Sequence, residues 1–337
     1  MTARTGWARP LLSLAALAVV VAVAMALLTP SASERNRGPG PTPDPGPTAL
    51  SAAEEYAYAA LRIMGERAFF VDEATWWPGV VGEAMAAARG ARSPAETYGA
   101  LTTALNAAAG PQGQLLPPGA VPSAEIPALP TVSVGAAIGR ITVPSVGPIT
   151  PKGASARATA LADTLGIYSS SATCGWVIDL RVTRSQEDWG LLAGLSAFIQ
   201  EGPIFDLEDR YGRAFHASAA TGSVFLDGRP MASSGHTKAR NTKPVAVLQS
   251  SETSGAGEAL ALALRHSNSV RSFGTATRGL PFTQEFGLSD GARLVLPTVR
   301  LTDRAGNGYA RGVPATVGTD DPERLAHEWL RSQCRQR

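Results

Sequence analysis

Two strand–turn–helix segments constrain the fold of this chain more than any other feature of its sequence. The first, from Cys174 to Gly202, holds the strand Trp176–Leu180, a polar turn and then an apolar-faced helix. The second, from Lys243 to Arg265, repeats this order and begins with the strand Val245–Leu248. Continuous apolar strands are typical of sheets covered on both faces, and strands that alternate with helices are typical of α/β folds. We therefore expect an α/β core with a mixed sheet.

Helical periodicity precedes this core. We expect helices over Leu50–Met64 and Pro78–Arg89, and a third that begins at the Ser93 cap and ends at Gly110. Pro111–Pro130 is proline-rich and is predicted to be a loop. The remaining predicted elements are a strand over Ala136–Val143, a helix over Ala154–Leu165, hairpin strands within Arg213–Arg229, strands over Val270–Phe273 and Arg293–Thr298, and a closing helix from Asp320 to about Cys334.

The amino terminus has the pattern of a membrane anchor. Arg4 and Arg9 precede the apolar run Leu11–Leu28, whose 18 residues would span about 27 Å as a helix, close to the thickness of a bilayer core. Because the arginines lie before the run, the rest of the chain should be outside the cytoplasm. The alternative is a signal peptide cleaved near Ser31–Ser33, which would leave a secreted protein. We favour the anchor, because no clear cleavage motif follows the run.

Composition then divides the chain. Residues 1–30 are the predicted anchor or signal segment, and residues 31–48 are a Pro/Gly-rich linker that cannot bury a core. We predict a helical lobe with its following loop over residues 49–130 and the α/β core over residues 131–334.

Charge and cysteine content exclude several kinds of protein. A formal net charge of +2 gives no electrostatic footprint for nucleic acid. The two cysteines, Cys174 and Cys334, can pair in an oxidising compartment, or Cys174 can be a small buried residue; the sequence leaves both open. The four histidines lie at positions without metal-ligand spacing, so we expect no metal and no other cofactor: His216, His236, His266 and His327.

An ordered set of four motifs resembles the tail-specific, or C-terminal-processing, serine peptidase family, in its branch without a PDZ module and with a tricorn-like core. The matching residues are Leu115–Pro118; Trp176–Arg181 with Trp189 and Ala193–Leu195; Pro244–Leu248 with Thr253 and Gly257–Ala259; and Ser272–Gly274 with Leu288–Ala292. The resemblance implies a ClpP/crotonase-like mixed-sheet core with an N-terminal helical lobe. It also implies a site built from a serine nucleophile, a histidine base and a turn that supplies oxyanion donors.

The reactive positions of this motif set are occupied by other residues. By position, the family's nucleophile falls on Gly255, its histidine on Gln112 and the adjacent serine on Gly113. The glycine pair of the oxyanion turn falls on Ser185 and Gln186. Glycine has no hydroxyl, and an amide cannot act as a base near neutral pH.

Ser254 is the remaining candidate nucleophile, one residue from the expected place. A shift of one residue turns a side chain by about 100° on a helix or to the other face of a strand. We therefore expect its hydroxyl to cap the helix that begins near Ala256.

Two functions follow as expectations. The first is a membrane-tethered, extracytoplasmic protein of this peptidase family that has lost or impaired proteolytic activity and binds a peptide or protein in a retained groove. The alternative is an active serine peptidase that uses Ser254 with an unrecognised base, such as His266 or Glu285.

Overall fold

The computed structural model describes residues 50–72, 74–120, 128–147, 149–185, 187–236, 240–267, 269–279 and 282–336. The predicted anchor and linker, and the predicted oxyanion-turn residue Gln186, lie outside these ranges. Among the described residues, no helix has both the length and the apolar character needed to span a bilayer.

The described helices alternate with strands over much of the chain. The α-helices are α1 (Ala52–Arg67), α2 (Trp77–Ala88), α3 (Pro94–Ala109), α4 (Pro151–Tyr168), α5 (Trp189–Gly194), α6 (Ala256–Leu264) and α7 (Pro322–Arg335), and the 3₁₀ turns are η1 (Gly110–Gln112) and η2 (Ser196–Phe198).

The strands form three sheets. The first is antiparallel and contains, in order, β1 (Gln114–Leu116), β14 (Arg293–Thr302), β6 (Gly202–Asp209), β7 (Ala214–Ala220), β8 (Ser223–Leu226) and β9 (Arg229–Ser233), with β13 (Phe282–Gly287) also paired to β14. The second is mixed and contains β15 (Val317–Gly318), β12 (Val270–Gly274), β10 (Val245–Gln249), β4 (Gly175–Asp179), β3 (Ile138–Thr142) and β2 (Thr131–Gly135). A short parallel pair joins β5 (Arg184–Ser185) to β11 (Ser254–Gly255).

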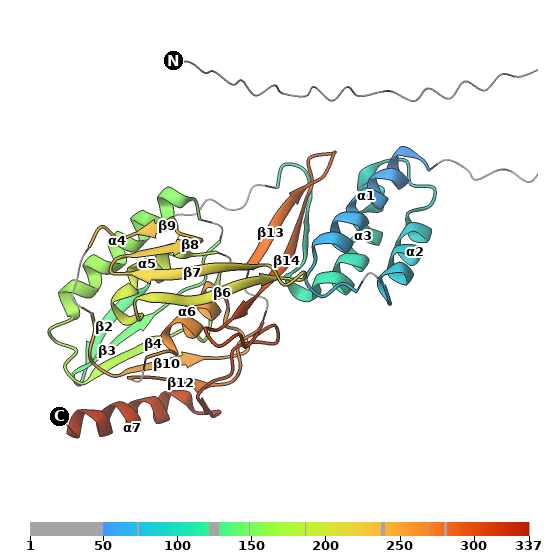
Figure 1. Ribbon diagram of the computed structural model, residues 1–337. Helices are drawn as coiled ribbons and strands as arrows, with labels where there is room; N and C mark the ends of the chain where they lie inside the picture. Colours follow the sequence, from blue (N-terminus) through green and yellow to red (C-terminus); the bar gives the residue numbers. More distant parts are fainter. Residues whose placement is uncertain are drawn as a thin grey trace, which may run out of the picture. The chain divides into compact units, whose positions relative to one another are not determined.

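The mixed sheet is covered on both faces, which explains its continuous apolar strands. Along β10, Val245 and Val247 point into the main core with α4, α5 and α6, whereas Ala246 and Leu248 point to the opposite face. That opposite face packs against Ala326 and Leu330 of α7, and Figure 1 shows α7 running beside β10 and β12. The predicted mixed-sheet α/β core is confirmed.

The three N-terminal helices form a separate small core, which confirms the predicted helical lobe. Leu61, Leu101 and Leu105 of α1 and α3 pack with Leu294 and Leu296 of β14. Helix α1 begins with a capping box in which the Ser51 hydroxyl accepts the Glu54 N–H and the Glu54 carboxylate accepts the Ser51 N–H. Strand β14 therefore belongs to the first sheet and to the hydrophobic core of the lobe at once.

Several sequence predictions are wrong in detail. The strand predicted over Ala136–Val143 is β3, but it begins two residues later, because Ala136 and Ala137 adopt positive φ angles of 48° and 63° in the turn that joins β3 to the unpredicted strand β2. The region predicted as loop over Pro111–Pro130 contains the short strand β1, which pairs with β14. Strands β6 and β13 were not predicted; both lie beside β14, and that pairing rather than local sequence pattern defines them.

Cys174 and Cys334 form a disulfide across a sequence separation of 160 residues. The bond joins the residue before β4 to the last turn of α7. The question that the sequence left open is therefore answered in favour of pairing.

Candidate functional site

Two turns meet where β4 and β10 end. Because the two strands are parallel and in register, with Leu248 opposite Asp179, the chain leaves both at the same sheet edge. The Thr253 hydroxyl donates to the Leu180 carbonyl at 2.8 Å, and the Ser254 N–H donates to the Thr183 carbonyl at 2.9 Å. These bonds hold the turn before α6 against the turn after β4.

Gly255 occupies the bend between β11 and α6. It is the N-cap of α6, is buried, and has φ 60° and ψ −126°. This backbone region is open to glycine and strained for other residues. Serine hydrolases place their nucleophile on a strained strand-to-helix turn of this kind, so the bend is present while its residue has no hydroxyl.

Ser185 lies directly opposite Gly255. The pairing of β5 with β11 places Arg184 against Ser254 and Ser185 against Gly255. The Ser185 hydroxyl accepts the Val146 N–H at 3.2 Å, so its side chain is engaged with the backbone. The turn predicted to supply oxyanion donors and the predicted nucleophile position are therefore neighbours.

Close packing between the two turns depends on Gly257. A Cβ atom at this position would lie 2.9 Å from a methyl carbon of Thr183 and 3.2 Å from one of Thr253. A side chain here would force the helix away from the turn after β4, so the glycine keeps the elbow closed.

Gln112 reaches this region from the end of the helical lobe. Its Nε2 donates to the Gly279 carbonyl at 2.5 Å, and the neighbouring Arg278 N–H donates to the Thr253 carbonyl at 2.9 Å. The loop at Arg278–Gly279 thus joins the predicted histidine position to the elbow. The side-chain amide acts here as a hydrogen-bond donor.

Gly113 is packed tightly against α3. An added Cβ would lie 2.7 Å from the Ala109 Cβ and 3.0 Å from Leu105 side-chain atoms. The serine that the resemblance expects at this position therefore does not fit without a shift of the helix.

Glu258 is a fully buried carboxyl group in the first turn of α6. Its two oxygens accept the Gly279 N–H at 3.1 and 3.2 Å. Burial raises its pKa from 4.5 to about 8, against the opposing effect of the Thr277 side-chain and Gly279 N–H bonds. The raised pKa favours the protonated carboxyl group, and Glu258 fixes the same loop that receives Gln112.

A cavity of about 310 Å³ opens beside this loop, between the end of α3 and the core. Its lining includes Phe70, Asn106, Gln112, Arg278 and Gly279. We refer to it as the lobe–core groove. The exposed side chain of Phe70 gives it an apolar side, and the amides of Asn106 and Gln112 give it hydrogen-bonding groups.

Arg278 is the one charged side chain among the described residues that line the lobe–core groove. Glu252, which precedes the elbow, pairs with Arg184 and lies 3.5 Å from Arg278. Two guanidinium groups share one carboxylate, so this cluster retains one positive charge.

A buried ion pair joins α4 to the residue that caps α5, at the end of the turn after β4. Nε of Arg157, on α4, lies 2.9 Å from Oδ2 of Asp188, and the side chains are 2% and 0% exposed. Asp188 also caps α5, because its Oδ1 accepts the Leu191 N–H at 2.9 Å.

Ser254 does not have the role predicted for it. The N-cap of α6 is Gly255, one residue later, and no side-chain bond caps that helix. Pairing with β5 holds Ser254 in an extended strand and so separates its hydroxyl from the helix end.

The two bases considered for Ser254 are placed elsewhere. His266 follows the far end of α6, which a rise of about 1.5 Å per residue puts roughly 15 Å from the elbow. Burial lowers its pKa. Glu285 lies on β13 and pairs with Arg293 at 2.6 Å.

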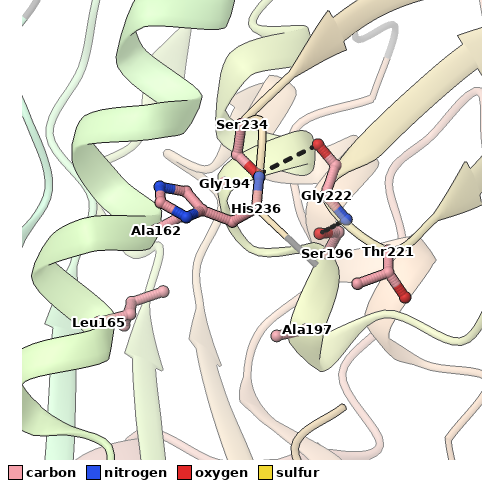
Figure 2. Close-up of a pocket in the computed structure, with 9 residues that line it drawn as sticks. All are labelled: Ala162, Leu165, Gly194, Ser196, Ala197, Thr221, Gly222, Ser234 and His236. Carbon is pink, nitrogen blue, oxygen red and sulfur yellow. Dashed lines mark hydrogen bonds between the residues drawn. The ribbon is translucent and has the colours of Figure 1, made fainter. Parts of the chain in front are cut away.

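A histidine lies near two serines at a second place, shown in Figure 2, between α4 and the β8–β9 strands. The His236 imidazole points to α4, where its Nε2 is 3.0 Å from Oδ1 of Asp163. The Ser196 hydroxyl accepts the Gly222 N–H, and the Ser234 hydroxyl donates to the Gly222 carbonyl. Both hydroxyls are occupied by backbone groups, so the cluster lacks the serine–histidine contact of a hydrolase.

The described residues contain no group of three or more His, Cys, Asp or Glu side chains able to hold a metal ion. The side chains that sequence reasoning missed are Glu258, which was noted only as part of a motif, Arg278 and the Arg157–Asp188 pair. An isolated glutamate inside the apolar run Ala256–Leu264 was the one signal that could have singled out Glu258, since helix residues on every side of it are buried.

The family is decided by comparison with known sequences. The profile of Peptidase family S41 matches residues 137–318, more than half of the chain. The chain belongs to peptidase family S41. This confirms the resemblance drawn from the four motifs.

One curated relative is the nisin-resistance protein of Lactococcus lactis subsp. lactis, with 26% identity over 163 residues. The match covers 48% of this chain and 51% of the relative, so the chain spans about half the length of that relative.

Solved structures share the fold. A lipoprotein from Streptococcus agalactiae superposes with a TM-score of 0.67 at 21% identity, over 84% of this chain and 98% of the other. A putative peptidase from Parabacteroides merdae gives 0.55 at 14% identity, over 80% and 90%. The photosystem II D1 C-terminal processing protease gives 0.53 at 15% identity, over 85% and 97%.

Proposed function

We propose that this S41 family member binds peptides in the lobe–core groove and does not cleave them by serine catalysis. The observation that carries the proposal is Gly255, a residue without a hydroxyl at the strained bend where the resemblance places the family's nucleophile. In well-studied serine proteases, loss of the nucleophile alone removes about 10⁶ in kcat.

Gln112, at the predicted position of the base, also supports a protein without serine catalysis. Gln112 stands where the resemblance places the base, and its amide donates to the Gly279 carbonyl. A group fixed in this way stabilises the groove but cannot accept a proton from a nucleophile.

A peptide is the ligand class that best fits the groove. Its lining combines an exposed aromatic ring, two amides and the guanidinium group of Arg278. This combination favours an extended chain with a carboxylate at or near the bound segment. Nisin is a suitable first probe, because the L. lactis relative is named for resistance to it.

The proposed location is the outer side of a membrane, with the body tethered through residues 11–28. Two arginines before an apolar run of bilayer length support this orientation. The S. agalactiae structure is of a lipoprotein, which gives a structural relative attached to a membrane by other means.

Labelling with a fluorophosphonate probe tests for a reactive serine. We expect no labelling of the wild-type chain. Labelling that disappears in Ser254→Ala would overturn the proposal in favour of the active-peptidase alternative, and a labelled S41 peptidase serves as the positive control.

Peptide binding is tested by fluorescence anisotropy on the full-length chain in a non-ionic detergent. We expect labelled peptides with a free C-terminal carboxylate to bind more tightly than their amidated forms. Arg278→Gln should weaken binding about tenfold or more, as for one charge-assisted bond, whereas Arg331→Gln on the exposed face of α7 should not. Equal affinities for wild type and Arg278→Gln would exclude the groove as the binding site.

A further inference from the structure

A second cavity, of about 160 Å³, lies at the C-terminal end of α1 in the helical lobe. It is bounded by the end of α1, the β6–β7 turn and the β13–β14 pair. It shares no lining residue with the lobe–core groove. We refer to it as the arginine pocket.

Three arginines from two separate parts of the chain line the arginine pocket. Arg67 belongs to the last turn of α1, and Arg210 and Arg213 belong to the β6–β7 turn. Arg210 donates to the carbonyls of Gly65, Ala68 and Val71, with the last bond at 2.6 Å. The turn is thereby fixed to the C-terminal end of α1.

The other two guanidinium groups are held by rings rather than by acids. The Arg213 guanidinium lies 4.7 Å from the centre of the Phe215 ring, and that of Arg67 lies 6.0 Å from the Phe286 ring. Within the described ranges, no carboxylate pairs with Arg67 or Arg213. Their N–H groups are exposed and can donate to a ligand.

The two carboxylates that border the pocket are already engaged. Oδ1 of Asp209 accepts the N–H groups of Tyr211 and Arg213, each at 2.9 Å. Glu66 pairs with Arg62 at 3.3 Å. Neither of these carboxylates therefore neutralises Arg67 or Arg213.

A buried hydroxyl at the base of the pocket has no partner. Thr298 of β14 is 7% exposed, and in the described part of the chain nothing bonds to its Oγ1. The Gln284 side chain lies on the neighbouring strand β13 and lines the same pocket. A buried hydroxyl group normally has a hydrogen-bond partner, so an unsatisfied one that faces a cavity points to a ligand.

We propose that the arginine pocket binds a phosphate group. Its donors approach from α1, from the β6–β7 turn and from β14, which suits a tetrahedral oxyanion better than a planar carboxylate. The Thr298 hydroxyl supplies a donor at the base, and Arg67 and Arg213 supply charge at the rim. Free inorganic phosphate and a phospholipid headgroup present the same chemistry.

The test measures inorganic phosphate binding by isothermal titration calorimetry on the full-length chain in detergent, at constant ionic strength. We expect saturable binding by the wild type and at least about tenfold weaker binding by the double variant Arg67→Gln/Arg213→Gln. Thr298→Val, which removes only the hydroxyl, should weaken binding about threefold or more.

Arg92→Gln is the control, because it removes one exposed positive charge from the helical lobe outside the pocket. It should bind phosphate as the wild type does. Equal affinities for the wild type and the double variant, or an equal loss in Arg92→Gln, would overturn the site.

Flotation with vesicles separates the two sources of phosphate. The chain is mixed with phosphatidylcholine vesicles that contain or lack phosphatidic acid, whose headgroup is a phosphate monoester. A pocket that serves a headgroup gives phosphatidic-acid-dependent flotation that inorganic phosphate competes away and the double variant loses. A pocket that serves free phosphate gives calorimetric binding without that dependence. Failure in both assays would overturn the proposal and leave the proposed peptide binding untouched.

Discussion

Gly255 and Ser185 are opposite each other in the parallel pair of β11 and β5. The resemblance to family S41 predicts Gly255 as the nucleophile position and Ser185 as part of the turn that supplies oxyanion donors. Backbone pairing holds these two predicted positions next to each other, and the residue at the first has no hydroxyl group.

Gly255→Ser should destabilise the protein. At φ 60° and ψ −126° a residue with a Cβ is strained, so we expect a loss of about 1–3 kcal/mol in the free energy of unfolding. Urea unfolding followed by circular dichroism measures it. Gly82→Ala is the control: Gly82 lies within α2 with no atom near an added Cβ, and this change should stabilise by about 0.5–1 kcal/mol. A neutral or stabilising Gly255→Ser would contradict the strained-elbow geometry.

The double variant Gln112→His/Gly255→Ser tests the positional assignments. If both positions are those of the family's base and nucleophile, the variant should gain fluorophosphonate labelling that neither single change produces alone. Because the Gln112 amide already reaches the loop on the elbow, a histidine there starts close to the new hydroxyl. A folded double variant that stays unlabelled would show that the assignments are wrong.

The α/β core was predictable from sequence because its strands are buried on both faces and read as apolar runs. Val245–Leu248 and Trp176–Leu180 carry that signal without any tertiary information. Strands β6 and β13 carry mixed patterns, because their exposure depends on their neighbours in the sheet, and they were missed. The hairpin turn at Ala136–Ala137 was missed for a different reason: alanine is a rare choice at positive φ, and no glycine or asparagine marked it.

The candidate site was predictable as a set of positions but not as a set of contacts. The motifs placed Gly255 and Ser185 in two turns that do adjoin. They could not show that Gln112 donates to Gly279, or that Glu258 fixes the same loop, since these contacts span 167 and 21 residues. Ser254 was misassigned as a cap because the short β5–β11 pairing shifts the helix start by one residue.

Glu258 should make stability depend on pH. Burial raises its pKa from 4.5 to about 8 in the folded state, so the folded protein holds this proton more tightly than the unfolded chain does. The contribution is fully present below pH 4.5 and is lost as the pH rises through 8. Glu258→Gln, which is neutral at every pH, should therefore flatten the decline in unfolding free energy between pH 5 and 8.

Urea titrations of wild type and Glu258→Gln at several pH values within that window measure the difference. Glu83→Gln, a change on the exposed face of α2, controls for loss of a surface carboxylate and should leave the profile as in the wild type. Parallel profiles for wild type and Glu258→Gln would mean that this carboxyl group does not hold a proton at neutral pH.

Arg157→Met should be strongly destabilising. The change leaves Asp188 without its cation at a side chain that is 0% exposed, and removal of one partner of a buried pair costs about 3–5 kcal/mol. Thermal and urea unfolding measure the loss. Arg324→Ala removes an exposed pair with Glu328 and should cost about 0.5 kcal/mol or less. Similar losses in the two variants would show that the Arg157–Asp188 pair is not desolvated.

Reduction of the Cys174–Cys334 disulfide should loosen α7 from one end. The N-terminal turn of α7 is held separately, because Glu323 pairs with Arg140 and with Arg181, the latter at 3.0 Å. A disulfide that closes a loop of 160 residues is worth about 2–5 kcal/mol. The variant Cys174→Ala/Cys334→Ala should lose that amount and unfold several degrees lower, and dithiothreitol should bring the wild type to the same midpoint without affecting the variant. Because the ion pairs remain, the reduced protein should still fold. An unchanged midpoint on reduction would mean that the ion pairs and the packing of Ala326 and Leu330 hold α7 in place without the disulfide.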